Sequence, residues 1–465
     1  MGAASIRSVV GTTLATLAAL LIGLCAGVVL VQPFTPDLAL VVTDTGFRWW
    51  ALSRPVGAVV GAIMAPVVCM AASRLRGRRL SAATLGAVIV AVLAEVGLGR
   101  VDSVAALVAG RYVEAAFAGA ALGAAAAVLR TRRAAIPALA AGAVAAFLLS
   151  AAAVSSNGIP RRYADYLAPE PSPVGGVGWL AVLAGALVVV AVLVEFGSGA
   201  VGHLAVVQWR PVGAVVLLAV GGAAAAFLAT AQTPTNWWLA GPALVLAPAV
   251  AGGAAMLLPG SDGVVVLAAT AITASGAAAA TVFERSVLPD PIMIAVLAAL
   301  ILLGVAAGAR WRIPATGMVL LAVILVCGTV PVGDLGLLHA VLLPMGSATV
   351  GVVLGSALPR EVAAGSVAPG SAVGASVGLG ALFLPGVAAA LTGAYRGTWT
   401  VSRQDFGWTA YTPLTSVPPG EAEYSLRLWD LAIIGDGRID AVTAWALAAL
   451  ILGCAGAAVL LRRAR

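Results

Sequence analysis

The stretch VDSVAALVAGRYVEAAFAGAALGAAAAVLRTRR, residues 101–133, decides what kind of protein this chain is. Its apolar part, about residues 103–129, is long enough to cross a bilayer, which takes roughly 20 helical residues. It contains one arginine and one carboxylate, Arg111 and Glu114, and it ends in three arginines. A charge inside a membrane helix usually faces a cavity or a partner, and a basic cluster at a helix end marks the cytoplasmic side. The stretch therefore predicts a membrane helix, its orientation and a polar centre.

The composition of the whole chain indicates the same class of protein. Of the 465 residues, 62% are hydrophobic and only 10% are charged, whereas about a quarter of the residues of a typical soluble domain are charged. Long apolar runs recur from end to end, which is typical of an all-α polytopic membrane protein in contact with the lipid bilayer. We attribute the net charge of +7 to membrane topology, and we expect no nucleic-acid partner.

Motifs for enzyme chemistry do not stand out. The sequence contains no phosphate-binding loop, no zinc-ligand spacing and no nucleophile elbow. The cysteines lie inside apolar runs, so we expect buried side chains and neither a disulfide framework nor a metal site. These are Cys25, Cys69, Cys327 and Cys454. We therefore predict no enzyme, no cofactor and no metal.

About fourteen spans can be placed along the chain, and a count of twelve is the alternative because a few of them are short or glycine-rich. They lie at about residues 9–32, 51–73, 80–98, 103–129, 134–154, 175–195, 211–231, 237–258, 263–283, 291–309, 314–331, 335–357, 367–393 and 441–461. A cytoplasmic N-terminus then puts most arginines into inner segments, as the positive-inside rule requires. We expect a bacterial inner-membrane protein with both termini in the cytoplasm. Two longer outer segments, 155–174 and about 394–440, remain between spans.

A weak internal repeat predicts how the spans are grouped. The segment AASRLRGRRLSAATLGAVIVAVL, residues 71–93, is similar to AAGARWRIPATGMVLLAVILV, residues 306–326. Both segments join two spans through an inner arginine-rich loop. We expect a six-span bundle at 1–195, two inserted spans at 196–260 and a second six-span bundle at 261–465. Repeated halves of this kind are a hallmark of secondary transporters.

Four stretches carry a family resemblance: LRGRR at 75–79, LVAGRYVEAAFAG at 107–119, RRYADYLAP at 161–169 and the long segment that begins HAVLLPMGS at 339. They resemble the major facilitator superfamily, in particular its 14-helix drug:proton antiporter branch. The resemblance implies a facilitator-like 6+2+6 arrangement with pseudo-symmetric halves, and it implies export.

The chain also departs from the pattern of that family. Arg74 stands where the inner loop of the family has an aspartate, Gly27 where proton-coupled members often have one, and Ala115 where helix four has a glycine. The chain therefore resembles a degenerate member of the superfamily.

Arg111 and Glu114 are the leading candidates for transport and proton coupling. They lie one helical turn apart and can share a face. The resemblance implies that Arg111 occupies the position linked to proton transfer in antiporters. Glu114 would take and release a proton as the pair separates; the alternative is a static ion pair that holds two helices together. Glu95 and Arg54 are candidates for the same network, with the alternative that both simply lie at the outer membrane surface.

The inner loop with Arg76, Gly77, Arg78 and Arg79 has two interpretations. The resemblance implies a gating loop that pairs with cytoplasmic helix ends. The alternative is a topology determinant that contacts anionic lipid headgroups.

Three functional hypotheses follow. The first is an inner-membrane secondary transporter that exports a hydrophobic or amphiphilic, lipid-like small molecule. The second is a non-transporting facilitator-fold subunit that docks an envelope protein through the outer segment 394–440, where Asp405, Trp408 and Tyr411 lie. The third is a lipid-linked glycosyltransferase with Asp37 and Asp44 as its acidic pair.

Overall fold

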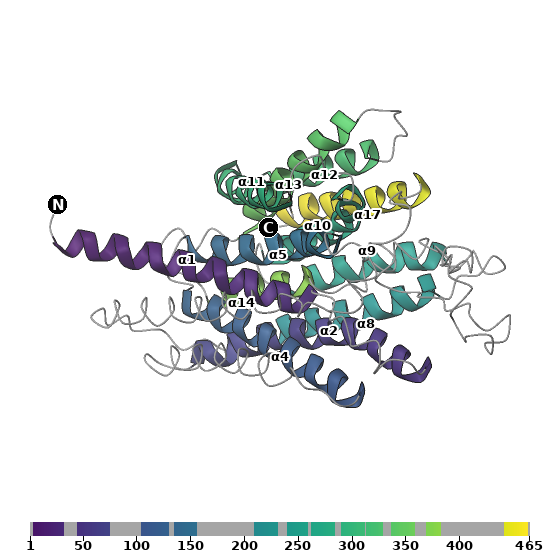
Figure 1. Ribbon diagram of the computed structural model, residues 1–465, viewed down its shortest axis with the longest axis horizontal. Coiled ribbons are helices and arrows are strands. Elements are labelled where there is room, and N and C mark those ends of the chain that lie inside the picture. Colours follow the sequence, from purple (N-terminus) through teal and green to yellow (C-terminus); the bar gives the residue numbers. More distant parts are fainter. Residues whose placement is uncertain are drawn as a thin grey trace, which may run out of the picture.

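The computed structural model describes residues 3–31, 44–74, 104–129, 134–155, 209–230, 240–258, 262–283, 290–311, 313–328, 336–358, 369–382 and 441–463. The helices within this part of the chain are α1 (Ala3–Val31), α2 (Asp44–Arg74), α4 (Val104–Leu129), α5 (Ala135–Ser155), α8 (Arg210–Thr230), α9 (Ala240–Leu257), α10 (Asp262–Phe283), α11 (Asp290–Trp311), α12 (Pro314–Cys327), α13 (Gly336–Ala357), α14 (Pro369–Leu382) and α17 (Ala441–Arg463). Over these ranges the chain is entirely helical (Figure 1).

The helical class predicted from the apolar runs is confirmed. Each of these helices coincides with one of the predicted spans. The predicted spans at 80–98 and 175–195 lie outside the described residues, as do both outer segments beyond Ser155 and before Ala441.

The ends of α12 follow from its local sequence. α12 begins with Pro314, whose missing N–H costs nothing at the first helical position. At its other end the N–H of Gly328 donates to the carbonyl of Ile324 over 3.0 Å. α9 and α13 continue through internal prolines, Pro248 and Pro344, which helices packed against neighbours in a membrane tolerate.

The helices pack in pairs that repeat between the two parts of the chain. In the first part α1 packs along α5 and α2 along α4; in the second part α10 packs along α14 and α11 along α13 (Figure 1). The cross-pairs α1–α4 and α10–α13 correspond as well, and α12 packs along α17. With α10 as the counterpart of α1, the helices that pair have the same order in both parts. The chain thus folds into two related halves.

The repeat extends to single backbone atoms. A Cβ on Gly123 of α4 would overlap the carbonyl oxygen of Ala65 in α2 and approach the backbone nitrogen of Cys69. A Cβ on Gly351 of α13 would meet the equivalent atoms of α11, the carbonyl oxygen of Ile301 and the nitrogen of Val305. Small residues let helices in membranes approach at backbone distance. The same close crossing is therefore built twice.

The two helices between the halves, α8 and α9, form a pair of their own. They pack against each other; α8 also packs against α2 and α14, and α9 against α10 and α17. In Figure 1 α8 runs alongside α2, and α9 lies on the side of α8 that is nearer to α10 and α17.

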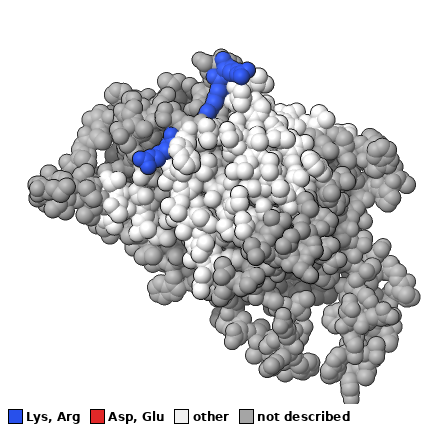
Figure 2. All heavy atoms as spheres, turned by 90° about the horizontal axis from the view of Figure 1, so that it is seen from above, with Lys and Arg blue, Asp and Glu red and all other residues white. Residues whose placement is uncertain are grey.

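The surface of the described helices is apolar. Large hydrophobic side chains are well exposed, among them Met256, Leu303 and Leu460 at 74%, 66% and 67%. Figure 2 shows basic side chains at two places on one face and no acidic side chain among the described residues there. By length and hydropathy, Gly11–Leu30 and Ala444–Arg463 qualify as membrane spans; the other apolar stretches that the structure describes are shorter. An extended apolar surface of this kind fits hydrocarbon rather than water, and we treat the chain as a multi-pass membrane protein.

Candidate functional site

Arg111 joins the first third of α4 to the end of α1. Its side chain is 7% exposed. Nη1 donates to the carbonyl oxygen of Val29 over 2.5 Å, and Nη2 donates to that of Leu30 over 3.1 Å. α1 ends at Val31, so these carbonyls belong to the last turn, which has no further intrahelical donors. The end of a helix also carries partial negative charge. A buried cation is therefore stabilised there, and its hydrogen bonds connect α4 to α1.

Glu114 forms the second contact of Arg111. Its Oε2 lies 3.6 Å from Nη1 of Arg111, three residues earlier on the same helix, and its side chain is 16% exposed. This separation is that of an ion pair and exceeds the length of a good hydrogen bond. Nη1 thus lies between a backbone carbonyl at short distance and a carboxylate at longer distance.

This arrangement allows the charge of the site to change while the hydrogen bonds between α4 and α1 are kept. Glu114 can take up a proton while Arg111 keeps its bonds to Val29 and Leu30. The guanidinium itself stays charged under all ordinary conditions. The chemistry available here is proton uptake and release on the carboxylate, beside a fixed cation.

Arg111 also lies against α2, beside Gly57. A Cβ on Gly57 would lie 3.5 Å from the Cβ of Ala115 and 3.8 Å from Cγ of Arg111. Arg111 therefore passes between α1 and α2. Sequence reasoning missed both neighbours of Arg111, which are the last carbonyls of α1 and Gly57 of α2. The spacing of Gly57 and Gly61 was an available signal for close approach, whereas a backbone carbonyl leaves no signal in a sequence.

The remaining predicted site residues are not brought together in the part of the chain that the structure describes. Arg54 belongs to α2, but its side chain lies outside the described residues. The other predicted residues also lie outside them: Glu95, Arg76, Gly77, Arg78, Arg79, Asp405, Trp408, Tyr411 and Asp37. Asp44 is the first residue of α2, and its side chain is likewise not described.

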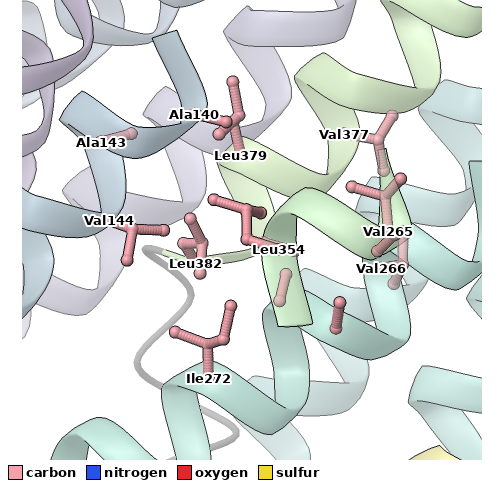
Figure 3. Close-up of a cluster of buried hydrophobic side chains, with 14 of the residues drawn as sticks. Ala140, Ala143, Val144, Val265, Val266, Ile272, Leu354, Val377, Leu379 and Leu382 are labelled. Atoms are coloured by element: carbon pink, nitrogen blue, oxygen red, sulfur yellow. The ribbon is translucent and has the colours of Figure 1, made fainter. Parts of the chain in front are cut away.

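The centre between the halves is packed with apolar side chains (Figure 3). Val144 of α5 lies near Leu379 and Leu382 of α14, with Ile272 of α10 and Leu354 of α13 beside them; all five are buried, at 1% exposure or less. The hydroxyl of Thr273 bonds to the carbonyls of Ala269 and Leu382, at 2.9 and 3.3 Å. Described polar groups here are satisfied by backbone, so the surfaces that the halves present to each other are apolar.

The expectation that the cysteines are buried is largely confirmed. Cys25, Cys69 and Cys454 are buried, and Cys327 is partly buried. Among the described residues, no group of three or more His, Cys, Asp or Glu side chains is placed to hold a metal ion.

Comparison with protein-family models finds no match, and neither does comparison with curated proteins. Three solved structures are similar over almost the whole chain. They are the human organic anion transporter MFSD10 (TETRAN), with 13% identity, a TM-score of 0.46 and 98% of each chain covered; an auto-inhibited POT family peptide transporter, with 16% identity, a TM-score of 0.47 and 98% and 96% covered; and a bacterial homolog of the human lysosomal transporter Spinster, inward-facing and unoccupied, with 17% identity, a TM-score of 0.40 and 100% and 96% covered. Likeness at this level does not establish an activity.

Proposed function

We propose that this protein is a secondary transporter of the bacterial inner (plasma) membrane, driven by protons and exporting a hydrophobic or amphiphilic, lipid-like small molecule. The observation that carries the proposal is the pair of buried Arg111 and partly buried Glu114 in a membrane helix, with Arg111 hydrogen-bonded to the end of α1. Ionisable groups inside membrane helices are functional by default. The working parts would be the bundles 1–195 and 261–465, with 196–260 inserted between them and both termini in the cytoplasm.

The proposed substrate class follows from the surfaces between the halves. Separation of α5 from α14 would expose Val144, Leu379 and Leu382, which are apolar and closely packed. A strongly charged solute would lose its hydration in such a cavity without gaining polar partners. An apolar or amphiphilic molecule gains dispersion contacts there and loses little.

Proton coupling would work through the distance between Glu114 and Arg111. At 3.6 Å the carboxylate is stabilised as an anion by the guanidinium. A rearrangement that lengthens this distance leaves the carboxylate in apolar surroundings, where the neutral form is cheaper, so Glu114 takes a proton. Return to the paired state releases it on the other side of the membrane.

The test is proton exchange by purified protein in liposomes. A pH indicator follows proton uptake and release through a titration around neutrality, for native protein and for Glu114→Gln. The matched control is Asp262→Asn, because Asp262 is another carboxylate at low exposure, at the start of α10. We expect one titration step to vanish in Glu114→Gln and to persist in Asp262→Asn. Identical curves for native protein and Glu114→Gln would refute proton coupling.

A second candidate function is a non-transporting membrane subunit that docks an envelope protein through residues 394–440. The observation in its favour is the packed apolar centre, together with the fixed bonds of Arg111 to Val29 and Leu30. These features also suit a static scaffold. This alternative predicts that Glu114→Gln is tolerated in cells and that shortening 394–440 is not; the transporter predicts the reverse.

A further inference from the structure

The seam between the two halves includes a close contact of α2 with α14. The two helices pack together although they belong to different halves. A Cβ on Gly380 of α14 would lie 3.0 Å from Cα and 3.3 Å from Cβ of Ala62 in α2, and Ala62 is fully buried. Any motion that separates the halves on this side must open this contact.

The inserted helices α8 and α9 lie across that seam. α9 packs against α10 and α17, which belong to the second half, and α8 packs against α14 of the second half and α2 of the first. The pair is thus held by three helices of the second half and reaches the first half through α8. Motion of α2 away from α14 must also change the contact of α2 with α8.

One face of α8 is buried in the protein. Ala214, Val215 and Leu218 are fully buried, whereas Val220 is 64% exposed. Leu217 and Gly221 approach Gly253 and Val250 of α9, respectively. The buried face is therefore occupied by protein, and the opposite face is left to lipid.

We propose that the α8–α9 pair is a strap that travels with the second half and holds the α2–α14 seam closed through α8. Contacts between membrane helices gain van der Waals energy from close fit, because lipid chains are as apolar as the side chains. Losing the fit of α8 therefore favours the open seam directly. The inference rests on the proposed function only because it assumes that the two halves move relative to each other.

The test measures seam opening without measuring transport. The native cysteines are replaced by alanine, and a single cysteine is placed at Ala62. Its rate of reaction with a small methanethiosulfonate reagent in liposomes reports how often the seam opens. A double variant, Ala62→Cys with Gly380→Cys, checks that the seam is closed at rest, because Cβ atoms at this distance can form a disulfide after a small adjustment.

We expect Leu218→Ala to raise the labelling rate by about threefold, which corresponds to about 0.6 kcal/mol of lost helix contact. Val220→Ala, on the lipid face of the same helix, should leave the rate unchanged. If Leu218→Ala does not fold, Leu218→Val removes less of the side chain at the same position, and the labelling rate should rise by less.

The outcomes separate the strap from the proposed function. Equal, measurable labelling in native protein, the Leu218 variants and Val220→Ala would overturn the strap and leave moving halves in place. No measurable labelling in any variant would overturn both the strap and alternating access on this side.

Discussion

The two halves share their packing but not their charges. The α2–α4 crossing in the first half and the α11–α13 crossing in the second half both bring a glycine onto a backbone carbonyl, at Gly123 and Gly351. α4 then carries Arg111 and Glu114, whereas α13 has the sequence GLLHAVLLPMGSATVGVVLGSA, without Arg, Lys, Asp or Glu. Packing that occurs twice is needed for the fold. A charge that occurs once serves something that one half does alone, here the hold on α1.

The largest expected effect falls on the shared packing. Gly123→Leu and Gly351→Leu should both prevent the native fold, because in each case even a Cβ would overlap a carbonyl oxygen of the facing helix. Overpacking of a core typically costs about 1–3 kcal/mol, and more where backbone must move. The measurement is the yield of monodisperse protein.

The matched control for these glycines is Gly456→Leu in α17, where a Cβ would meet nothing within 4 Å. It should express like native protein. Normal expression of only one of Gly123→Leu and Gly351→Leu would show that the two crossings are not equivalent.

The next effect falls on the charged pair that α4 carries and α13 does not. Arg111→Ala removes the bonds to Val29 and Leu30 and leaves Glu114 without its cation. Breaking a buried ion pair by removing one partner typically costs about 3 kcal/mol or more of the free energy of unfolding. Thermal unfolding in detergent measures this loss.

Arg111→Lys tests the geometry of the same joint. A lysine keeps the charge, but it cannot offer two donors in a planar fork to two carbonyls. We expect stability between that of native protein and that of Arg111→Ala. Full native stability with lysine would mean that charge alone suffices at the end of α1.

Glu114→Gln should have a smaller effect on stability than Arg111→Ala. Arg111 keeps its two carbonyl partners, and the substitution removes only the contact at 3.6 Å. We expect a loss of about 1 kcal/mol in unfolding free energy, typical of a single hydrogen bond or modest ion pair. A larger loss than for Arg111→Ala would place the main support of the joint in the ion pair.

The smallest effect is expected in α13, at the one titratable residue of its sequence. His339→Gln should leave proton exchange unchanged, because the second half carries no counterpart of the Arg111–Glu114 pair in this helix. The pH-indicator assay in liposomes measures it. Loss of a titration step in His339→Gln would show that both halves take part in coupling.

Helices and their paired halves were accessible to sequence reasoning for a simple reason. A membrane span needs about 20 apolar residues whatever its neighbours are, so runs such as 103–129 and 441–461 mark helices by themselves. The repeat at 71–93 and 306–326 indicated two halves, and the pairing α2–α4 with α11–α13 agrees with it. Arg111 and Glu114 were found because a charge is conspicuous in an apolar run.

What surrounds that pair was not accessible. The carbonyls of Val29 and Leu30 are backbone groups that every residue has, and Gly57 is one of 55 glycines in the chain. The position of α8 across the α2–α14 seam also left no pattern, because lipid-facing and protein-facing residues are alike apolar.

The sequence by itself determined that this chain forms membrane helices. It also determined that the span 103–129 carries Arg111 and Glu114 within its apolar run. Both follow from the cost of exposing polar groups to hydrocarbon, which depends on residue type alone. Only the tertiary structure decided which helix end Arg111 holds and which helices α8 bridges. Those contacts depend on close fit between surfaces of the same polarity, and fit exists only once the helices are assembled.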